Sequence, residues 1–268
     1  MSGIKKHKIG IFIPVRLSSK RFPKKAIIDT YFGKPLEILI QNLSKNYIKK
    51  KDIVICTTKD KCDKKLKILS KKIKCNFFSG SKSDIVNRFY NANLKYKYDY
   101  IVEVDGDDIM TDFKFIDICI KTLQKKKLDL VYSSNLPIGM NCKVFTSEAL
   151  KKTNHITLSK NNANGFMSLF YKNPLISKKK LFFTGYAKPK VRLTLDYIED
   201  IKFFETLLFL LKEKKLKPNI QNYFKIFKAN KDILKINYFR NFDYKSNTKK
   251  MKPLVIKIED KLKKISIS

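Results

Sequence analysis

The sequence has few arginines, histidines and cysteines, and these shortages exclude several kinds of protein. Five of its 59 basic residues are arginine, it has two histidines and no tryptophan, and its five cysteines form no Cys-x-x-Cys pair. Zinc sites and disulfide frameworks depend on clustered cysteine or histidine, so we expect neither. The first apolar run, residues 9–15, contains Pro14 and ends at Arg16, which is too short for a signal peptide or a membrane span. We therefore expect a soluble, cytoplasmic protein.

The chain is also short of acidic residues, and its net charge is +35. A lysine-rich surface gains affinity for nucleic acid by releasing counterions from the phosphates, so a nucleic-acid partner is one explanation. The lysines are nonetheless spread along the whole chain and accompany abundant isoleucine and asparagine, a composition that an AT-rich genome would impose on any protein. We favour the compositional explanation, although a positive field suits anionic substrates in either case.

What is present is an alternation of short apolar runs with longer segments of helical period. The runs predict buried strands at residues 9–15, 53–57, 75–78, 100–104 and 128–133, with a late strand at 192–196. The periodic segments predict helices at residues 36–47, 60–71, 84–94, 113–123, 198–212 and 219–228. This order predicts an α/β fold with a doubly wound, mostly parallel sheet, in which ligands bind beyond the carboxyl ends of the strands.

The length and the 43% hydrophobic content fit one compact domain, which we place at residues 1–245. The periodicity is blurred between residues 143 and 190, where we expect an acceptor-binding or dimerisation lobe. Residues 246–268 are expected to form a C-terminal extension, and residues 245–252 to be the most mobile segment.

The loop after the first predicted strand, residues 16–25, concentrates phosphate-binding groups. In this first loop Arg16 and Arg21 lie five residues apart, Ser18 and Ser19 form a small-residue turn, and Lys25 closes the segment. Guanidinium groups bind two phosphate oxygens at once, and backbone N–H groups in such a turn meet others. A basic surface loop is the simpler alternative, but the scarcity of arginine elsewhere favours phosphate binding. Neither a Walker loop nor a dinucleotide fingerprint is present.

Two acidic segments follow other predicted strands. Asp107 belongs to a group of four acids after the fourth strand, and such a group suits Mg²⁺, which accepts few carboxylates and keeps water and phosphate as further ligands. Asp112 is better explained as the cap of the next helix. In the second segment, Arg192, Thr194 and Asp196 alternate along an expected strand and share one face.

The pattern R-x-x-S-x-R-x-P-x-K of the first loop, followed by "GKPLE", resembles the nucleotide-binding signature of the sugar-activating cytidylyltransferases. These include the enzymes that make CMP-linked ulosonic and neuraminic acids and the family of the spore coat polysaccharide biosynthesis protein F. "VDGDD" and "RLTLD" resemble the two acidic elements of the same family. The resemblance covers about residues 8–210 and implies a Rossmann-like fold of the nucleotide-diphospho-sugar transferase type.

The resemblance implies roles for individual residues. Nucleotide contacts are expected from Arg16, Ser18, Ser19, Arg21, Lys25, Gly80, Ser81, Asp84 and Asp107. Mg²⁺ is expected at Asp107 and Asp196, and these two residues with Arg16 and Lys25 form the expected catalytic group. Acceptor contacts are expected from Asn135, Gly139, Asn141 and Arg192. For Asp84, an i,i+4 ion pair with Arg88 on a helix is an equally good explanation.

These roles describe a magnesium-dependent enzyme that joins CMP, from CTP, to an acidic sugar and releases pyrophosphate, for surface glycan or lipopolysaccharide synthesis. A homodimer is expected. The alternatives are a nucleotidyltransferase acting on a phosphonate or a polyol phosphate, and a non-enzymatic nucleic-acid-binding protein built on the same fold.

Overall fold

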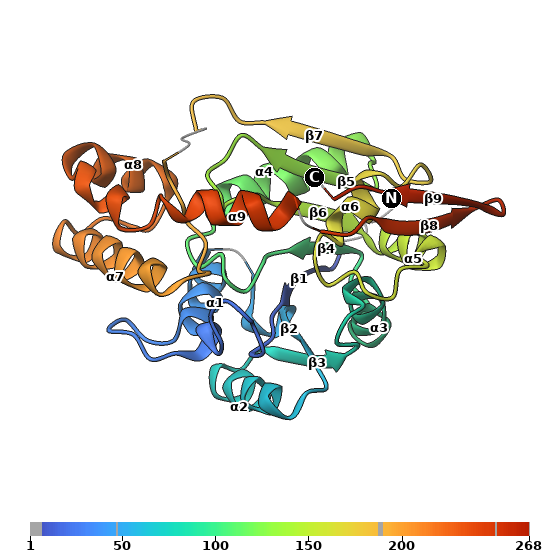
Figure 1. The fold of residues 1–268 in the computed structure, drawn as a ribbon, viewed down its shortest axis with the longest axis horizontal. Coiled ribbons are helices and arrows are strands. Elements are labelled where there is room, and N and C mark those ends of the chain that lie inside the picture. The colour runs from blue at the N-terminus through green and yellow to red at the C-terminus, as the bar shows by residue number, and fades with distance from the viewer. Residues whose placement is uncertain (1–6, 47, 187–189, 250, 268) are drawn as a thin grey trace, which may run out of the picture.

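The computed structural model describes residues 7–46, 48–186, 190–249 and 251–267. Strands and helices alternate along its first half (Figure 1): β1 (Ile9–Pro14), α1 (Pro35–Asn46), β2 (Ile53–Thr58), α2 (Lys64–Ile73), β3 (Asn76–Gly80), α3 (Ile85–Tyr96), β4 (Tyr100–Glu103), α4 (Phe113–Lys126) and β5 (Leu130–Ser134). The second half contains β6 (Lys143–Thr146), α5 (Ser147–Ile156), α6 (Met167–Tyr171), β7 (Lys178–Phe182), α7 (Ile198–Glu213), α8 (Ile220–Ala229), α9 (Arg240–Lys249), β8 (Leu254–Ile258) and β9 (Lys261–Ile265). Four short 3-10 helices lie between these elements: η1 (Lys25–Ile27), η2 (Lys50–Asp52), η3 (Lys61–Asp63) and η4 (Lys231–Ile236).

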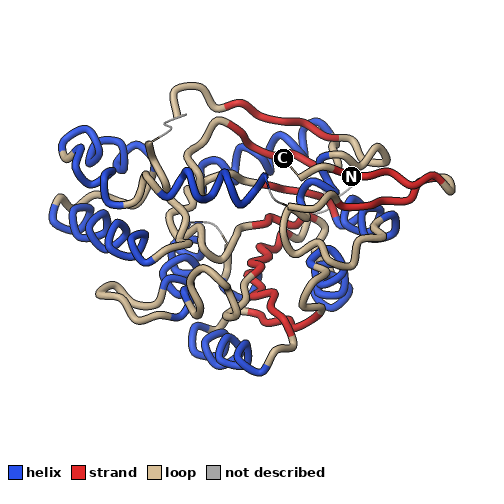
Figure 2. Tube along the Cα trace, viewed as in Figure 1, coloured by secondary structure: helices blue, strands red, loops and turns tan. Residues whose placement is uncertain are grey.

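The main sheet has seven strands in the order β3-β2-β1-β4-β6-β5-β7, and β8 pairs with β9 in a separate hairpin. Every pairing in the main sheet is parallel except those that β6 makes with β4 and β5. Along the chain, α1 to α4 each connect two consecutive strands, and Figure 2 shows helices flanking the central strands. The predicted doubly wound, mostly parallel α/β fold is therefore confirmed, with the five predicted strands of its first half in place.

Two hydrophobic clusters cover the two faces of this sheet. Side chains of α1, α2, α4, α7 and α8 form the larger cluster, and those of α3, α5, α6 and the hairpin form the other. The strand residues alternate between the clusters: Ile11 and Ile13 belong to the first and Phe12 to the second. Burial on both faces explains why β1, β2 and β4 are nearly continuous apolar runs.

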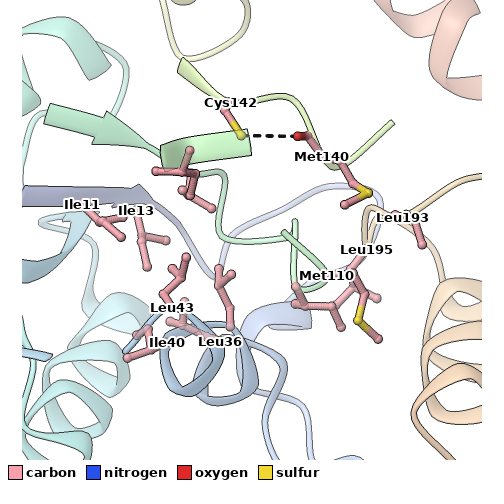
Figure 3. Packing of buried hydrophobic residues seen from close by; sticks show 14 of the residues in the cluster. Ile11, Ile13, Leu36, Ile40, Leu43, Met110, Met140, Cys142, Leu193 and Leu195 are labelled. Carbon is pink, nitrogen blue, oxygen red and sulfur yellow. Dashed lines mark hydrogen bonds between the residues drawn. The ribbon is translucent and has the colours of Figure 1, made fainter. Parts of the chain in front are cut away.

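The predicted strand at residues 192–196 is wrong, although its alternation is correct. Leu193 and Leu195 are fully buried in the larger cluster, near Met140 and Met110 (Figure 3). The backbone makes only one bridge, between Arg192 and Ile138. Its N–H groups donate to loop carbonyls, from Leu193 to Ile138 (2.8 Å) and from Leu195 to Asp107 (2.9 Å), rather than to a neighbouring strand.

The second half of the chain is more closely integrated than the sequence predicts. Within 143–190, β6 lies in the middle of the sheet and β7 pairs with β5 at the edge. The boundary drawn after residue 245 falls inside α9. Residues 245–249, expected to be mobile, form the end of that helix, and residue 250 lies outside the described residues. Within the described part of the chain, no helix has the length and hydrophobicity that crossing a membrane requires.

The C-terminal extension is packed against the domain. Leu254, Ile256 and Ile265 of the hairpin are buried in the second cluster, and Ile256 bridges to Thr157 at the end of α5. These three side chains explain the packing, because they give a charged hairpin one apolar face.

Candidate active site

A cavity of about 850 Å³ lies where β1, β4 and β5 end. This is the edge at which doubly wound sheets bind their ligands. Nine of the predicted site residues line it: Arg16, Ser19, Arg21, Lys25, Asp107, Asn135, Gly139, Asn141 and Asp196. The structure thus brings together residues that lie up to 180 positions apart in the sequence.

Lys25 connects the first loop to both acidic segments. Its Nζ lies 2.5 Å from Oδ2 of Asp107 and 2.9 Å from Oδ1 of Asp196, and Nη2 of Arg21 donates to the same Asp196 oxygen at 2.6 Å. Burial alone would lower the pKa of Lys25, but the two carboxylates outweigh it and raise that pKa. Burial would likewise raise the pKa of Asp196, whereas Lys25, Arg21 and Arg192 lower it. The site therefore holds a charged lysine between carboxylates.

The surroundings of Asp107 act on its pKa in the opposite direction from those of Asp196. Loss of hydration and the neighbouring Asp196 and Asp105 carboxylates raise its pKa, and only Lys25 acts in the other direction. Its carbonyl accepts the bond from Leu195 N at 2.9 Å, which ties the loop after β4 directly to the segment that carries Asp196. The two acidic motifs are thereby placed side by side by the backbone as well as by Lys25.

Arg192 supports Asp196 from the side away from the cavity. It is fully buried, donates from Nη2 to Asp196 Oδ2 at 2.9 Å, and donates from Nε to Asp200 Oδ1 at 3.1 Å. Asp200 also accepts from the N–H of Asp196 (2.7 Å), and Asn237 donates to Asp200 at 2.9 Å. The predicted acceptor contact Arg192 is thus fully buried and is not among the described residues that line the cavity.

Asp63 anchors the first loop, a role that no motif of the sequence indicates. Its carboxylate accepts from the N–H of Leu17 at 2.8 Å and from Thr57 and Thr58 at the end of β2. Burial opposes ionisation of Asp63, but these hydrogen bonds dominate and lower its pKa. The N–H of Lys24 donates back to the Leu17 carbonyl at 2.9 Å, with Lys24 in the left-handed region at φ 59°. The loop is therefore closed on itself and tied to β2.

Four of the predicted nucleotide-binding residues lie outside the lining of the cavity. Ser18 is exposed, and neither it nor Gly80, Ser81 or Asp84 lines the cavity. Asp84 caps α3 by accepting from Asn87 N (3.0 Å) and receives a bond from Nδ2 of Asn162 (2.7 Å).

Arg88, four residues after Asp84, does line the cavity. Its Nη1 donates to the Ser81 carbonyl at 3.1 Å, so Arg88 and Asp84 bond to different partners and do not form the i,i+4 pair. Gly80 allows this arrangement, since a β-carbon there would lie 3.1 Å from Cγ of Arg88. The predicted region thus borders the cavity, with Arg88 rather than Asp84 among the lining residues.

The wall of the cavity that is formed by β5, β6, α6 and β7 carries a second charged cluster. Lys143 of β6 places Nζ 2.7 Å from Glu103 and 3.0 Å from Asp105. Burial raises the pKa of Glu103 to about 8, because its side chain is fully enclosed beneath the cavity. The rings of Tyr132 and Tyr171 stack at 4.3 Å on this wall. Lys172 and Lys180 also line it.

The loop from Asn135 to Asn141 shapes the same wall. Asn135 and Gly139 both have positive φ, 60° and 92°, and a β-carbon on Gly139 would lie 2.1 Å from the Leu193 carbonyl oxygen. Only glycine permits that approach, and it places the loop against the segment that leads to Asp196. Ser133 meets Asn141 at 3.5 Å across the loop.

The two carboxylates that contact Lys25 fit a magnesium ion whose remaining ligands are phosphate and water. Asp107 and Asp196 both reach one ammonium group, so they are close enough to share a single cation. No cluster of three or more His, Cys, Asp or Glu side chains suited to a metal occurs among the described residues. Two carboxylates completed by phosphate and water match Mg²⁺ better than metals held entirely by protein ligands.

Comparison with known proteins agrees with this geometry. Residues 10–233 match the sequence model of a family described as cytidylyltransferase. An uncharacterized protein of Methanocaldococcus jannaschii is 34% identical over 203 residues, and the match covers 73% of this chain and 81% of that protein.

Solved structures share the fold. A cytidylyltransferase from Leptospira borgpetersenii serovar Hardjo-bovis matches with a TM-score of 0.77 at 22% identity, covering 85% of this chain and 97% of that chain. A CMP:2-keto-3-deoxy-manno-octonic acid synthetase complexed with CTP matches with a TM-score of 0.54 at 14% identity, covering 77% of this chain and 99% of that chain.

Proposed function

Because this chain belongs to the cytidylyltransferase family, we propose that it transfers the cytidylyl group of CTP to a hydroxyl of an acidic sugar of the ulosonic or nonulosonic type. Pyrophosphate is the second product. The CMP-linked sugar would serve surface glycan synthesis, including lipopolysaccharide, and the enzyme would act as a cytoplasmic homodimer.

The observation that carries the proposal is the position of Lys25 between Asp107 and Asp196, beside Arg21 on the cavity wall. In the reaction, the acceptor hydroxyl loses its proton to water as its oxygen bonds to the α-phosphorus of CTP. The bond from that phosphorus to the bridging oxygen breaks, and the electron pair leaves with pyrophosphate. Lys25, Arg21 and Arg16 would neutralise the triphosphate and the leaving group, so that catalysis rests on positioning and electrostatics. This chemistry needs no covalent enzyme intermediate.

Asp107 and Asp196 would hold the magnesium ion. When bound, Mg²⁺ supplies positive charge that stabilises the phosphate oxygens and fixes their orientation. Lys25 would then exchange part of its carboxylate contacts for phosphate oxygens. Arg192 and Asp200 keep the Asp196 carboxylate directed at the cavity during that exchange.

The wall that carries Lys143, Lys172 and Lys180 supports an anionic acceptor. Lysine ammonium groups attract carboxylate and phosphate alike, and the stacked rings of Tyr132 and Tyr171 offer an apolar surface beside them. A polyol phosphate or phosphonate fits the same charges, so it is the second candidate acceptor.

The test is pyrophosphate release from CTP in the presence of Mg²⁺, measured with a panel of acidic sugars and, in parallel, with polyol phosphates and phosphonates. We expect release only with the acidic sugars, and calorimetry should show CTP binding without acceptor. Release with the phosphorylated or phosphonate acceptors alone would assign the second candidate. Absence of CTP binding, combined with steeply salt-dependent binding to DNA or RNA, would replace the enzyme by a nucleic-acid-binding protein.

A further inference from the structure

The fifth arginine, Arg240, lies outside residues 10–233 and outside every motif of the chain, yet it contacts the site. It begins α9, which runs across the molecule from α8 toward the β8–β9 hairpin (Figure 1). Its guanidinium carbon lies 4.6 Å from the ring centre of Tyr197, the residue that follows Asp196.

Tyr197 is shared by three guanidinium groups. Besides Arg240, the guanidinium carbons of Arg192 and Arg21 lie 5.5 and 5.7 Å from the centre of the same ring. Arg192 holds Asp196 from behind, and Arg21 donates to Asp196 from the cavity side. The ring therefore touches both arginines that fix this carboxylate, and it is itself covered by the third.

Arg240 is fixed by ion pairs that leave it over the ring. Its Nη2 and Nε lie 2.8 and 3.3 Å from the two carboxylate oxygens of Glu199, and its Nη1 lies 2.9 Å from Asp243. This two-pronged pairing lowers the pKa of Glu199 and raises that of Arg240. A lysine could keep the charge but not the planar fork or the stacked geometry.

Arg21 has more freedom than its neighbours. Its side chain is 36% exposed, whereas the Asp196 side chain that it contacts is 3% exposed. The aromatic face of Tyr197 limits the positions that the Arg21 guanidinium can adopt, since cation–π attraction favours a place near the ring. A group that must meet a triphosphate gains affinity when its position is fixed before binding.

We propose that Arg240 is a positioning residue for CTP binding: through Tyr197 it holds the Arg21 guanidinium where the triphosphate binds. This inference rests on the proposed function. It makes the C-terminal segment beyond the family match a part of the active site, because Asn237, just before α9, also bonds to Asp200 and to the Arg192 carbonyl.

The experiment compares Arg240→Lys, Tyr197→Leu and Tyr197→Phe with wild type and with Lys235→Ala. Lys235 forms an exposed ion pair with Asp232 and serves as the control. Calorimetry first establishes CTP binding by wild type, and only its absence counts against the proposed function. We then expect Arg240→Lys and Tyr197→Leu to weaken CTP binding about five- to tenfold, on the scale of a cation–π contact. Tyr197→Phe keeps a ring and should lose far less than Tyr197→Leu.

The kinetic pattern separates positioning from general support of the fold. With saturating CTP, both variants should recover most of the wild-type kcat, and their KM for the acceptor should stay within twofold. If Arg240→Lys and Tyr197→Leu bind CTP as wild type does, the inference is overturned. It is equally overturned if both variants fail to fold by circular dichroism, because Arg240 would then be needed for the fold alone.

Discussion

Lys25 and Asp196 meet across 171 positions of the sequence, with Nζ of the lysine 2.9 Å from Oδ1 of the aspartate. The lysine also reaches Asp107, so one ammonium group offsets the repulsion between two carboxylates. A triphosphate with its metal ion would bring both charges that this arrangement needs, negative for Lys25 and positive for the aspartates. The three side chains are therefore arranged for a ligand that carries both.

Replacing either aspartate by asparagine should abolish most of the activity. Asp107→Asn and Asp196→Asn keep the size of the side chain and remove the charge that would bind Mg²⁺. We expect kcat/KM to fall at least about 100-fold, the scale of losing one preorganised electrostatic contact to the reacting phosphate. Pyrophosphate release with CTP and the acceptor that the panel selects measures the effect.

The matched control for these variants is Asp232→Asn, which changes an exposed carboxylate that pairs with Lys235 on the surface. Its rate should stay within twofold of wild type. If the two site variants retain rates within a few-fold of wild type, the metal does not bind at these carboxylates.

Removing Asp63 should weaken both the fold and CTP binding. Asp63→Ala leaves the N–H of Leu17 and the hydroxyl groups of Thr57 and Thr58 without this acceptor in a buried place. Stranding buried donors costs about 1–3 kcal/mol each before relaxation, so we expect the free energy of unfolding to fall by about 2–4 kcal/mol. The KM for CTP should rise, because the first loop loses its attachment to β2.

Urea unfolding and steady-state kinetics measure the two effects of Asp63→Ala. Asp117→Ala is the control, since Asp117 forms an i,i+4 pair with the exposed Lys121 and the substitution should cost under about 0.5 kcal/mol. Equal stability of the two variants would show that Asp63 does not anchor the loop.

Glu103 should make the protein less stable as the pH rises. Its pKa is raised from 4.5 to about 8 by burial, so between these values the folded protein retains a proton that the unfolded chain has lost. Stability is then greatest below pH 4.5 with respect to this group and declines up to pH 8, by about 5 kcal/mol at most. Glu103→Gln cannot lose the proton and should flatten this part of the curve. Urea unfolding of both proteins from pH 5 to 8 tests it, and parallel curves would disprove the assignment.

The sequence predicted the sheet because its strands are buried on both faces and its helices carry a clear period. It did not predict the place of β6, whose four residues begin with Lys143 and show no long apolar run. Its position between β4 and β5 depends on contacts between distant parts of the chain, which a local pattern does not contain.

Part of the site could be predicted from the order of strands and loops, whereas the depth of buried residues could not. Arg21, Lys25 and Asp107 lie in the loops after β1 and β4, and the carboxyl ends of parallel strands meet at one edge, so their convergence could be foreseen. Asp196 belongs to a segment without a strand, so its place was predicted from the resemblance alone. The alternation of residues 192–196 indicated which side chains share a face but not how deep they lie, and Arg192 proved to be fully buried. Asp63 lies in a lysine-rich stretch typical of a surface helix, and only the fold reveals its bonds to the first loop.

Gly139 should tolerate no side chain, because two segments of the site touch through it. In Gly139→Ala the new β-carbon would lie 2.1 Å from the carbonyl oxygen of Leu193, at a φ of 92° that already disfavours alanine. Relief of that clash moves the loop away from the segment leading to Asp196.

Gly33→Ala is the matched control, since φ there is 106° and no described atom lies within 4 Å of the new carbon. Its free energy of unfolding should fall only by the cost of placing alanine in the left-handed region, about 1–2 kcal/mol. Gly139→Ala should lose clearly more in urea unfolding and should also raise the KM for the acceptor. Equal losses in the two variants would show that the close approach of these segments does not shape the pocket.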